Sequence, residues 1–265
     1  MTRSFLYHSK SSLRRRRLVI QLTRPSDDVP LAADCDEQIA VPEIRAVPAT
    51  VPELLAMLRS APSVTWLFTG DTLTLPGQPS ERNSHVSALT HAIRDELGRY
   101  DDAFISSEAP RLRLRELLDN FEQRIGRFAP HIVIVSCGVE ELRATGESSL
   151  AFERMFHELI ERIRGAGAVA VINTPPRPEM GEGVEHADEL IRLEAIRACT
   201  AESPAFLVDH WDHWEQSSEL HWLAADGQSL SHSGAKAFAD EFVRELQLDE
   251  LKHQISEVDE PLPVE

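Results

Sequence analysis

The segment from Val64 to Thr74 reads V-T-W-L-F-T-G-D-T-L-T and predicts a buried strand that ends in a tight turn. Its apolar run stops at Gly70, as is typical of strands in parallel sheets. Ligands of open α/β sheets bind at the carboxyl ends of the strands. We therefore expect Asp71 and Thr72 to present short polar groups to a crevice. Taken alone, the pattern also fits an ordinary strand followed by a polar turn.

Apolar strands and amphipathic helices alternate along the rest of the chain. We expect strands at 64–69, 103–106, 131–136, 168–173 and 205–208. We expect helices from Thr50 and at 83–98, 111–127, 148–165, 187–201 and 233–247. This order predicts a three-layer α/β/α domain with a parallel five-stranded sheet over residues 50–248. Residues 1–49 are expected to form a basic arm and a linker rich in Pro and Asp, and 249–265 an acidic tail.

The net charge and the cysteines limit the partners and the cellular location that fit this sequence. The 265 residues carry a formal net charge of −17, which disfavours nucleic acid and anionic lipid as partners of the domain. Residues 1–24 hold seven basic and no acidic residues, and form either a solvated tail or an arm for an acidic partner. No apolar run approaches the ~18 residues of a membrane span. The three scattered cysteines fit neither a disulfide framework nor a metal site and indicate a reducing, cytoplasmic location.

Short motifs resemble the conserved blocks of the SGNH (GDSL-type) hydrolases. Gly70-Asp71-Thr72-Leu73-Thr74 is similar to the first block, in which Ser stands where this chain has Thr72. Gly138-Val139-Glu140-Glu141 is similar to the third block, Gly-x-Asn-Asp. The segment from Asp226 to Gly234 is similar to the fifth block, Asp-x-x-His with a following glycine. The resemblance covers roughly 62–248 in the family's block order.

This resemblance implies a flavodoxin-like domain that hydrolyses carboxylic esters, often acetyl groups on sugars, without cofactor or metal. In the family, Ser is the nucleophile and His the general base, which the Asp three residues earlier orients. This chain has Thr72 at the nucleophile, Glu140 at the oxyanion-binding Asn and Ser229 at the base. Ser107 lies in the region of the second block, which here has no glycine. An ionised carboxylate cannot donate to an oxyanion, and serine is no useful base at neutral pH.

Two function hypotheses follow from these substitutions. In the first, the chain is a degenerate member that keeps the crevice as a binding surface for a small ester or acetylated sugar. In the second, it is a working esterase in which His232 replaces the missing base and acts with Thr72 and Asp226. The sequence indicates no oligomeric state.

Three further features each have a chemical interpretation and an ordinary structural one. Crowded carboxylates at Asp71, Glu140 and Asp226 could recruit a divalent ion. Cys137 could be a thiol nucleophile, although a buried inert cysteine is the commoner outcome at the end of an apolar strand. The segment H-W-D-H-W at 210–214 could bind a metal or a sugar ring, but its spacing favours two tryptophans packing inward from a short helix.

Overall fold

A parallel five-stranded sheet forms the centre of the computed structural model, as expected. The structure describes residues 47–73, 84–136, 142, 148–177, 185–216, 222–224 and 229–254. The strand order is β2-β1-β3-β4-β5. The strands are β1 (Thr65–Gly70), β2 (Ala103–Ser106), β3 (Ile132–Ser136), β4 (Val169–Asn173) and β5 (Phe206–Val208).

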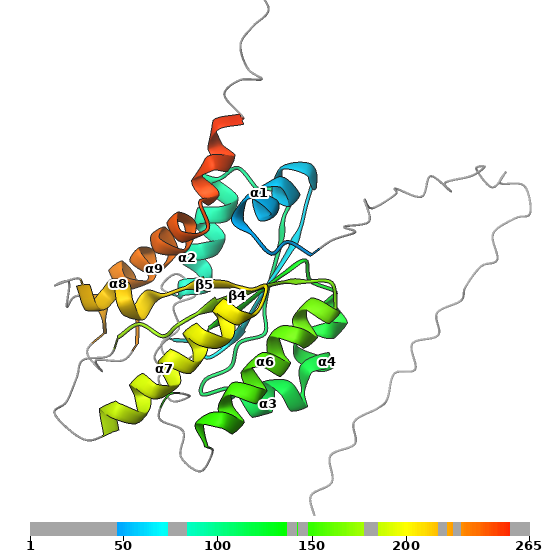
Figure 1. The fold of residues 1–265 in the computed structure, drawn as a ribbon. Helices are drawn as coiled ribbons and strands as arrows, with labels where there is room; N and C mark the ends of the chain where they lie inside the picture. The colour runs from blue at the N-terminus through cyan, green and yellow to red at the C-terminus, as the bar shows by residue number, and fades with distance from the viewer. Residues whose placement is uncertain are drawn as a thin grey trace, which may run out of the picture. The chain divides into compact units, whose positions relative to one another are not determined.

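Helices cover both faces of this sheet (Figure 1). One face carries α1 (Val51–Ser60), α2 (His85–His91) and α9 (His232–Glu245); the other carries α3 (Leu114–Asp119), α6 (Ser149–Gly165) and α7 (Glu185–Glu202). The pleat divides the core accordingly, since Trp66 and Phe68 pack on the α9 side and Leu67 on the α6 side. The result is the predicted three-layer α/β/α architecture.

Two expected helices are interrupted. The helix expected at 83–98 runs as α2 and then widens into a π-helical turn, η2 (Ala92–Glu96). The helix expected at 111–127 is split into α3, α4 (Phe121–Arg124) and η3 (Gly126–Phe128). The break falls at Asn120, whose backbone (φ −114°, ψ 26°) leaves the helical region while its side-chain amide donates to the Glu116 carbonyl at 2.8 Å. Asparagine competes for backbone bonds in this way.

The ends of the domain follow capping and packing rules. Thr50 and Glu53 form a capping box at the start of α1. The last described elements are α9 and η5 (Leu248–Gln254), and Leu251 in η5 is buried in the core on the α9 side. In the short helix α8 (His210–Gln216), Trp211 and Trp214 are buried, so the packing interpretation of this segment is confirmed. Within the described ranges, no helix combines the length and apolarity required to cross a bilayer.

Gly70, at the end of β1, is the position where the fold requires glycine. Its φ is +99°, in the region that L side chains avoid, and a Cβ there would overlap the Ser136 carbonyl of the neighbouring strand. The Asp71 amide donates to that same carbonyl at 2.9 Å. The turn after β1 is therefore held against the end of β3 by the backbone alone.

We expect Gly70→Ala to lower the free energy of unfolding by about 3 kcal/mol or more, because the change adds a backbone clash to the strain of a positive φ. Two glycines provide matched controls, since neither has an atom within 4 Å of an added Cβ. Gly167→Ala, at φ +83°, should cost only the strain of about 1–2 kcal/mol, and Gly165→Ala should be close to neutral. Denaturant titrations that rank the three variants differently would contradict this assignment.

Candidate functional site at the carboxyl edge of the sheet

The tip of β1 carries two of the candidate residues, Asp71 and Thr72. Both are half-buried. One Asp71 carboxylate oxygen accepts the backbone amide of Arg111 at 3.1 Å, where the chain takes a left-handed turn (φ 59°). Asp71 therefore fixes the loop that follows β2 and is not simply a free acid in the crevice.

Ser107 follows β2 and lies beside the same tip. Its amide donates to the Phe68 carbonyl at 2.7 Å, and its own carbonyl accepts Arg124 Nη1 at 2.9 Å. Ser107 is half-buried. The Ser107 backbone therefore extends the pairing between β1 and β2 by one residue.

The fifth-block segment is bound directly to the first-block segment. The Leu230 amide donates to the Leu73 carbonyl at 3.1 Å, which places Ser229 next to the Thr72–Leu73 backbone. Ser229 is only 8% exposed. Its carbonyl accepts the Ala224 amide at 2.7 Å, and Leu223 and Leu230 form an antiparallel bridge. The bond between the two segments therefore lies one residue from the implied base position and one residue from the implied nucleophile position.

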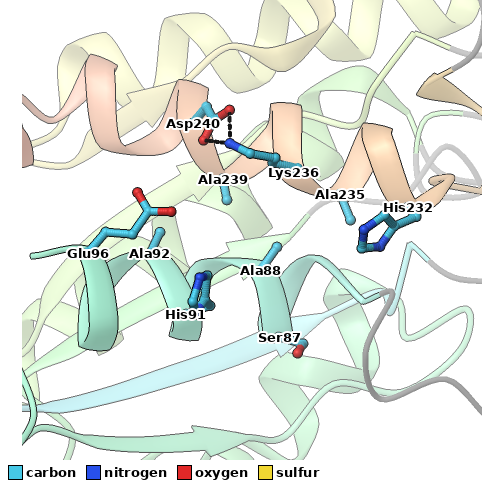
Figure 2. Close-up of a pocket in the computed structure, with 10 residues that line it drawn as sticks. All are labelled: Ser87, Ala88, His91, Ala92, Glu96, His232, Ala235, Lys236, Ala239 and Asp240. Carbon is cyan, nitrogen blue, oxygen red and sulfur yellow. Dashed lines mark hydrogen bonds and ion pairs between the residues drawn. The ribbon is translucent and has the colours of Figure 1, made fainter.

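His232 begins α9 and lines a groove between α9 and the helix formed by α2 and η2 (Figure 2). The cavity measures about 430 Å³. Its floor is formed by four alanines that face one another across the two helices, and its rim is polar. The alanines are Ala88, Ala92, Ala235 and Ala239, and the rim residues are Ser87, His91, Glu96, His232, Lys236 and Asp240. On the rim, Lys236 is paired with Asp240 at 2.7 Å. The groove residues include His232 but not Thr72.

Several candidates lie outside the described residues. They are Cys137, Gly138, Glu140, Glu141 and Asp226. Within the described part of the chain, no group of three or more His, Cys, Asp or Glu side chains is placed to hold a metal ion. Two of the three carboxylates considered for a divalent ion, Glu140 and Asp226, are not among those residues.

Sequence reasoning missed a buried polar cluster formed by His85, Glu108 and Ser136. Glu108 Oε1 lies 2.7 Å and Ser136 Oγ 3.2 Å from His85 Nε2, and the side chains of His85 and Glu108 are 0% and 6% exposed. Both contacts use the same ring nitrogen. A Ser-His-acid relay needs the serine and the acid on opposite nitrogens, so this cluster does not have the geometry that activates a serine.

A second buried pair joins α8 to α9. His210 Nδ1 lies 2.7 Å from Glu241 Oε2, with 0% and 2% of the two side chains exposed. Burial raises the Glu241 pKa from the ordinary 4.5 to about 7, against the opposing effects of His213 and Arg244, which lie within 4.0 Å. Burial, and then the nearby His85, lowers the His210 pKa well below 6.5. The proton of the pair therefore lies on the Glu241 carboxyl group, and the His210 imidazole is neutral.

The sequence carried only indirect signals of these pairs. His85 occupies the apolar face of the helix expected at 83–98, and Glu108 follows the strand at 103–106. Nothing in their spacing indicates that they meet. Asp209, which follows β5, accepts Arg197 Nε at 2.6 Å and Thr174 Oγ1 at 3.1 Å. Its carboxylate fixes the start of α8, because the Asp212 amide also donates to it.

Solved structures of esterases and lipases share this architecture. A lipase/acylhydrolase from Enterococcus faecalis superposes with a TM-score of 0.59 at 15% identity, over 72% of this chain and 96% of that one. A GDSL-like lipase from Parabacteroides merdae gives 0.59 at 15% identity, over 70% and 96%. An acetyl xylan esterase from Geobacillus stearothermophilus gives 0.58 at 15% identity, over 70% and 95%. No family model matches the sequence, and no curated protein matches it.

The Glu241–His210 pair makes a specific prediction about pH. The raised Glu241 pKa contributes stability below pH 4.5 that is lost as pH rises through about 7. The lowered His210 pKa contributes stability above pH 6.5 that is lost as pH falls. Between pH 4.5 and 6.5 the two effects cancel, because the folded and unfolded forms of the pair each bind one proton.

Glu241→Gln should remove that cancellation. The remaining neutral His210 then opposes folding below pH 6.5, by up to about 1.4 kcal/mol per pH unit. Chemical denaturation at pH 5, 6 and 7 should show the variant losing stability relative to wild type as pH falls. Asp240→Asn, which changes a half-exposed carboxylate on the same helix, is the matched control. Parallel stability curves for Glu241→Gln and wild type would refute the assignment.

Proposed function

We propose that this chain, which has the SGNH/GDSL hydrolase-like fold, is a catalytically impaired member of that class that keeps its crevice as a binding surface. The ligand class is a small ester or an acetylated sugar. Two of the structural neighbours named above are a lipase/acylhydrolase and an acetyl xylan esterase, whose names refer to acyl and acetyl groups. The scattered cysteines, of which Cys199 is a buried free thiol, fit a reducing location such as the cytoplasm.

The position of Ser229 is the observation that supports this proposal most directly. Its segment is bound to the Leu73 backbone, which supports a place for Ser229 near residue 72. A serine hydroxyl cannot accept the nucleophile's proton at neutral pH, and an unactivated hydroxyl is a weak nucleophile. The substitution therefore removes the proton acceptor while leaving the backbone around it in place.

Two further substitutions work in the same direction. The Thr72 side chain carries a methyl group that restricts χ1 and crowds any attacking path. Glu140 stands where the resemblance implies an oxyanion donor, and loss of one such donor costs about 100- to 1,000-fold in rate. A base at another position would not restore the missing oxyanion donor.

The alternative function is an active ester hydrolase that uses Thr72, His232 and Asp226. It is favoured by the place of His232, two residues beyond Leu230, whose amide is bonded to Leu73. His232 also lines the groove between α9 and the helix formed by α2 and η2. It requires the imidazole to reach Thr72 across the turn that starts α9.

An assay of the purified chain with p-nitrophenyl acetate separates the two functions. We expect no turnover above the buffer rate from pH 5 to 9, because no described side chain supplies a base at the Ser229 position. The alternative predicts turnover that is lost in both Thr72→Ala and His232→Ala. Turnover that both changes abolish would rule out the impaired form.

Restoring the family's residues tests the same idea in the opposite direction. A variant with Thr72→Ser, Glu140→Asn and Ser229→His should acquire esterase activity, because each change replaces a missing nucleophile, oxyanion donor or base. The same variant with Ala at position 72 is the control and should stay inactive. Failure of the folded triple variant to turn over p-nitrophenyl acetate would show that the crevice has lost more than these three groups.

A further inference from the structure

Two imidazoles pack against the Phe238 ring in the core between the sheet and α9. The His210 and Phe238 rings stack with centroids 3.5 Å apart, and His85 meets Phe238 edge-on at 5.3 Å. Each imidazole is bonded through one nitrogen to a buried carboxylate at 2.7 Å, His85 to Glu108 and His210 to Glu241. Neither imidazole has any exposed surface.

The other nitrogen of each imidazole has no partner among the described residues. These atoms are His85 Nδ1 and His210 Nε2, and both are inaccessible to solvent. The fully buried Asn173 has no partner for either its amide nitrogen or its amide oxygen. Buried polar groups in native proteins nearly always have hydrogen-bond partners, so four unpaired atoms on three side chains require an explanation.

The sheet brings these three side chains together. Asn173 is in register with Ser136 on one side and with Val208 on the other. Register partners in parallel strands face the same side, and Ser136 Oγ contacts His85 at 3.2 Å. Val208 lies on the α9 side of the core, two residues before His210. Asn173 therefore lies between the two imidazoles, on the face that Phe238 covers.

We propose that His85, Asn173 and His210 form an internal water site that links the two carboxylate–imidazole pairs. His85 offers a lone pair at Nδ1 when its Nε2 donates to Glu108, whereas His210 offers the Nε2 proton because its Nδ1 accepts a hydrogen bond from the Glu241 carboxyl group; the amide adds one donor and one acceptor. Water both donates and accepts and typically makes about three bonds inside proteins. A metal ion would use the His85 lone pair and the Asn173 oxygen but would leave the two donors, His210 Nε2 and Asn173 Nδ2, unpaired.

The water site connects five elements under the turn that carries Asp71. These are α2, β3, β4, α8 and α9, which contribute His85, Ser136, Asn173, His210 and Glu241 in that order. Its occupation gives a hydrogen-bonded path from Glu108 to Glu241 that no direct side-chain contact between the described residues provides. This inference does not depend on whether the crevice above it is catalytic.

Water-selective NMR on the wild-type protein with labelled histidines provides the primary test. We expect cross-relaxation between long-lived water and the ring C–H protons of both His85 and His210. The nitrogen His85 Nδ1 should show the shift of a hydrogen-bond acceptor, and His210 Nε2 should show that of a protonated donor. The absence of water cross-peaks at both rings would overturn the proposal, as would ring signals that a chelator shifts, because these would reveal a metal ion.

A variant pair extends the test. Asn173→Leu removes both amide atoms and should abolish the water cross-peaks at His85 and His210. Thr200→Val is the matched control, because it removes a buried hydroxyl, bonded to the Ile196 carbonyl at 2.7 Å, from a helix on the other face of the sheet. It should leave both sets of cross-peaks unchanged. Cross-peaks that persist at full intensity in folded Asn173→Leu would exclude the amide from the site.

Discussion

The close approach of Gly70 to the Ser136 carbonyl fixes the geometry of everything that follows β1. Because no side chain intervenes, the chain can reverse direction within one residue, and the Asp71 amide bonds to that carbonyl at 2.9 Å. Asp71 then holds the Arg111 backbone, while Leu73 receives the Leu230 amide. The loops after β1 and β2 and the segment before α9 are thereby joined at one edge of the sheet. A single backbone contact between two strands thus organises the part of the candidate site that the structure describes.

Most of the bonds described at that edge involve backbone atoms, so they do not depend on which side chains these positions carry. The Ser229 carbonyl and the Leu230 amide make their bonds whatever side chain occupies position 229. Gly234 is constrained in a similar way, since a Cβ there would overlap the Trp222 carbonyl. The fold therefore constrains the backbone conformation at these positions but not the acid–base groups of their side chains. Other side chains could therefore occupy position 229 without disturbing these backbone bonds.

The sequence predicted the architecture well because it depends on local patterns. The apolar runs that end in polar residues and the periodic faces of the helices correctly placed all five strands. The pattern failed where one side chain breaks a helix, as Asn120 does through its bond to Glu116. The contacts of the site were harder to foresee, because His85 and Glu108 are 23 residues apart and meet only through tertiary packing. The bond between Leu230 and Leu73 is equally non-local, so motif order could indicate proximity at the edge but not which atoms touch.

The π-helical turn that follows α2 has a consequence for how this chain tolerates changes in length. In η2 the Leu97 amide reaches back five residues to the Ala92 carbonyl, so the turn contains one residue more than an α-helical turn. Every side chain beyond it is rotated by about 100° relative to an uninterrupted α-helix. Removing one residue from this turn would restore regular helical winding and shift Leu97 and Arg99 around the axis. Arg99 bonds Asp102 and the Leu58 carbonyl of α1. The extra residue in η2 therefore determines which way Arg99 points around the helix axis, and so whether it can reach α1.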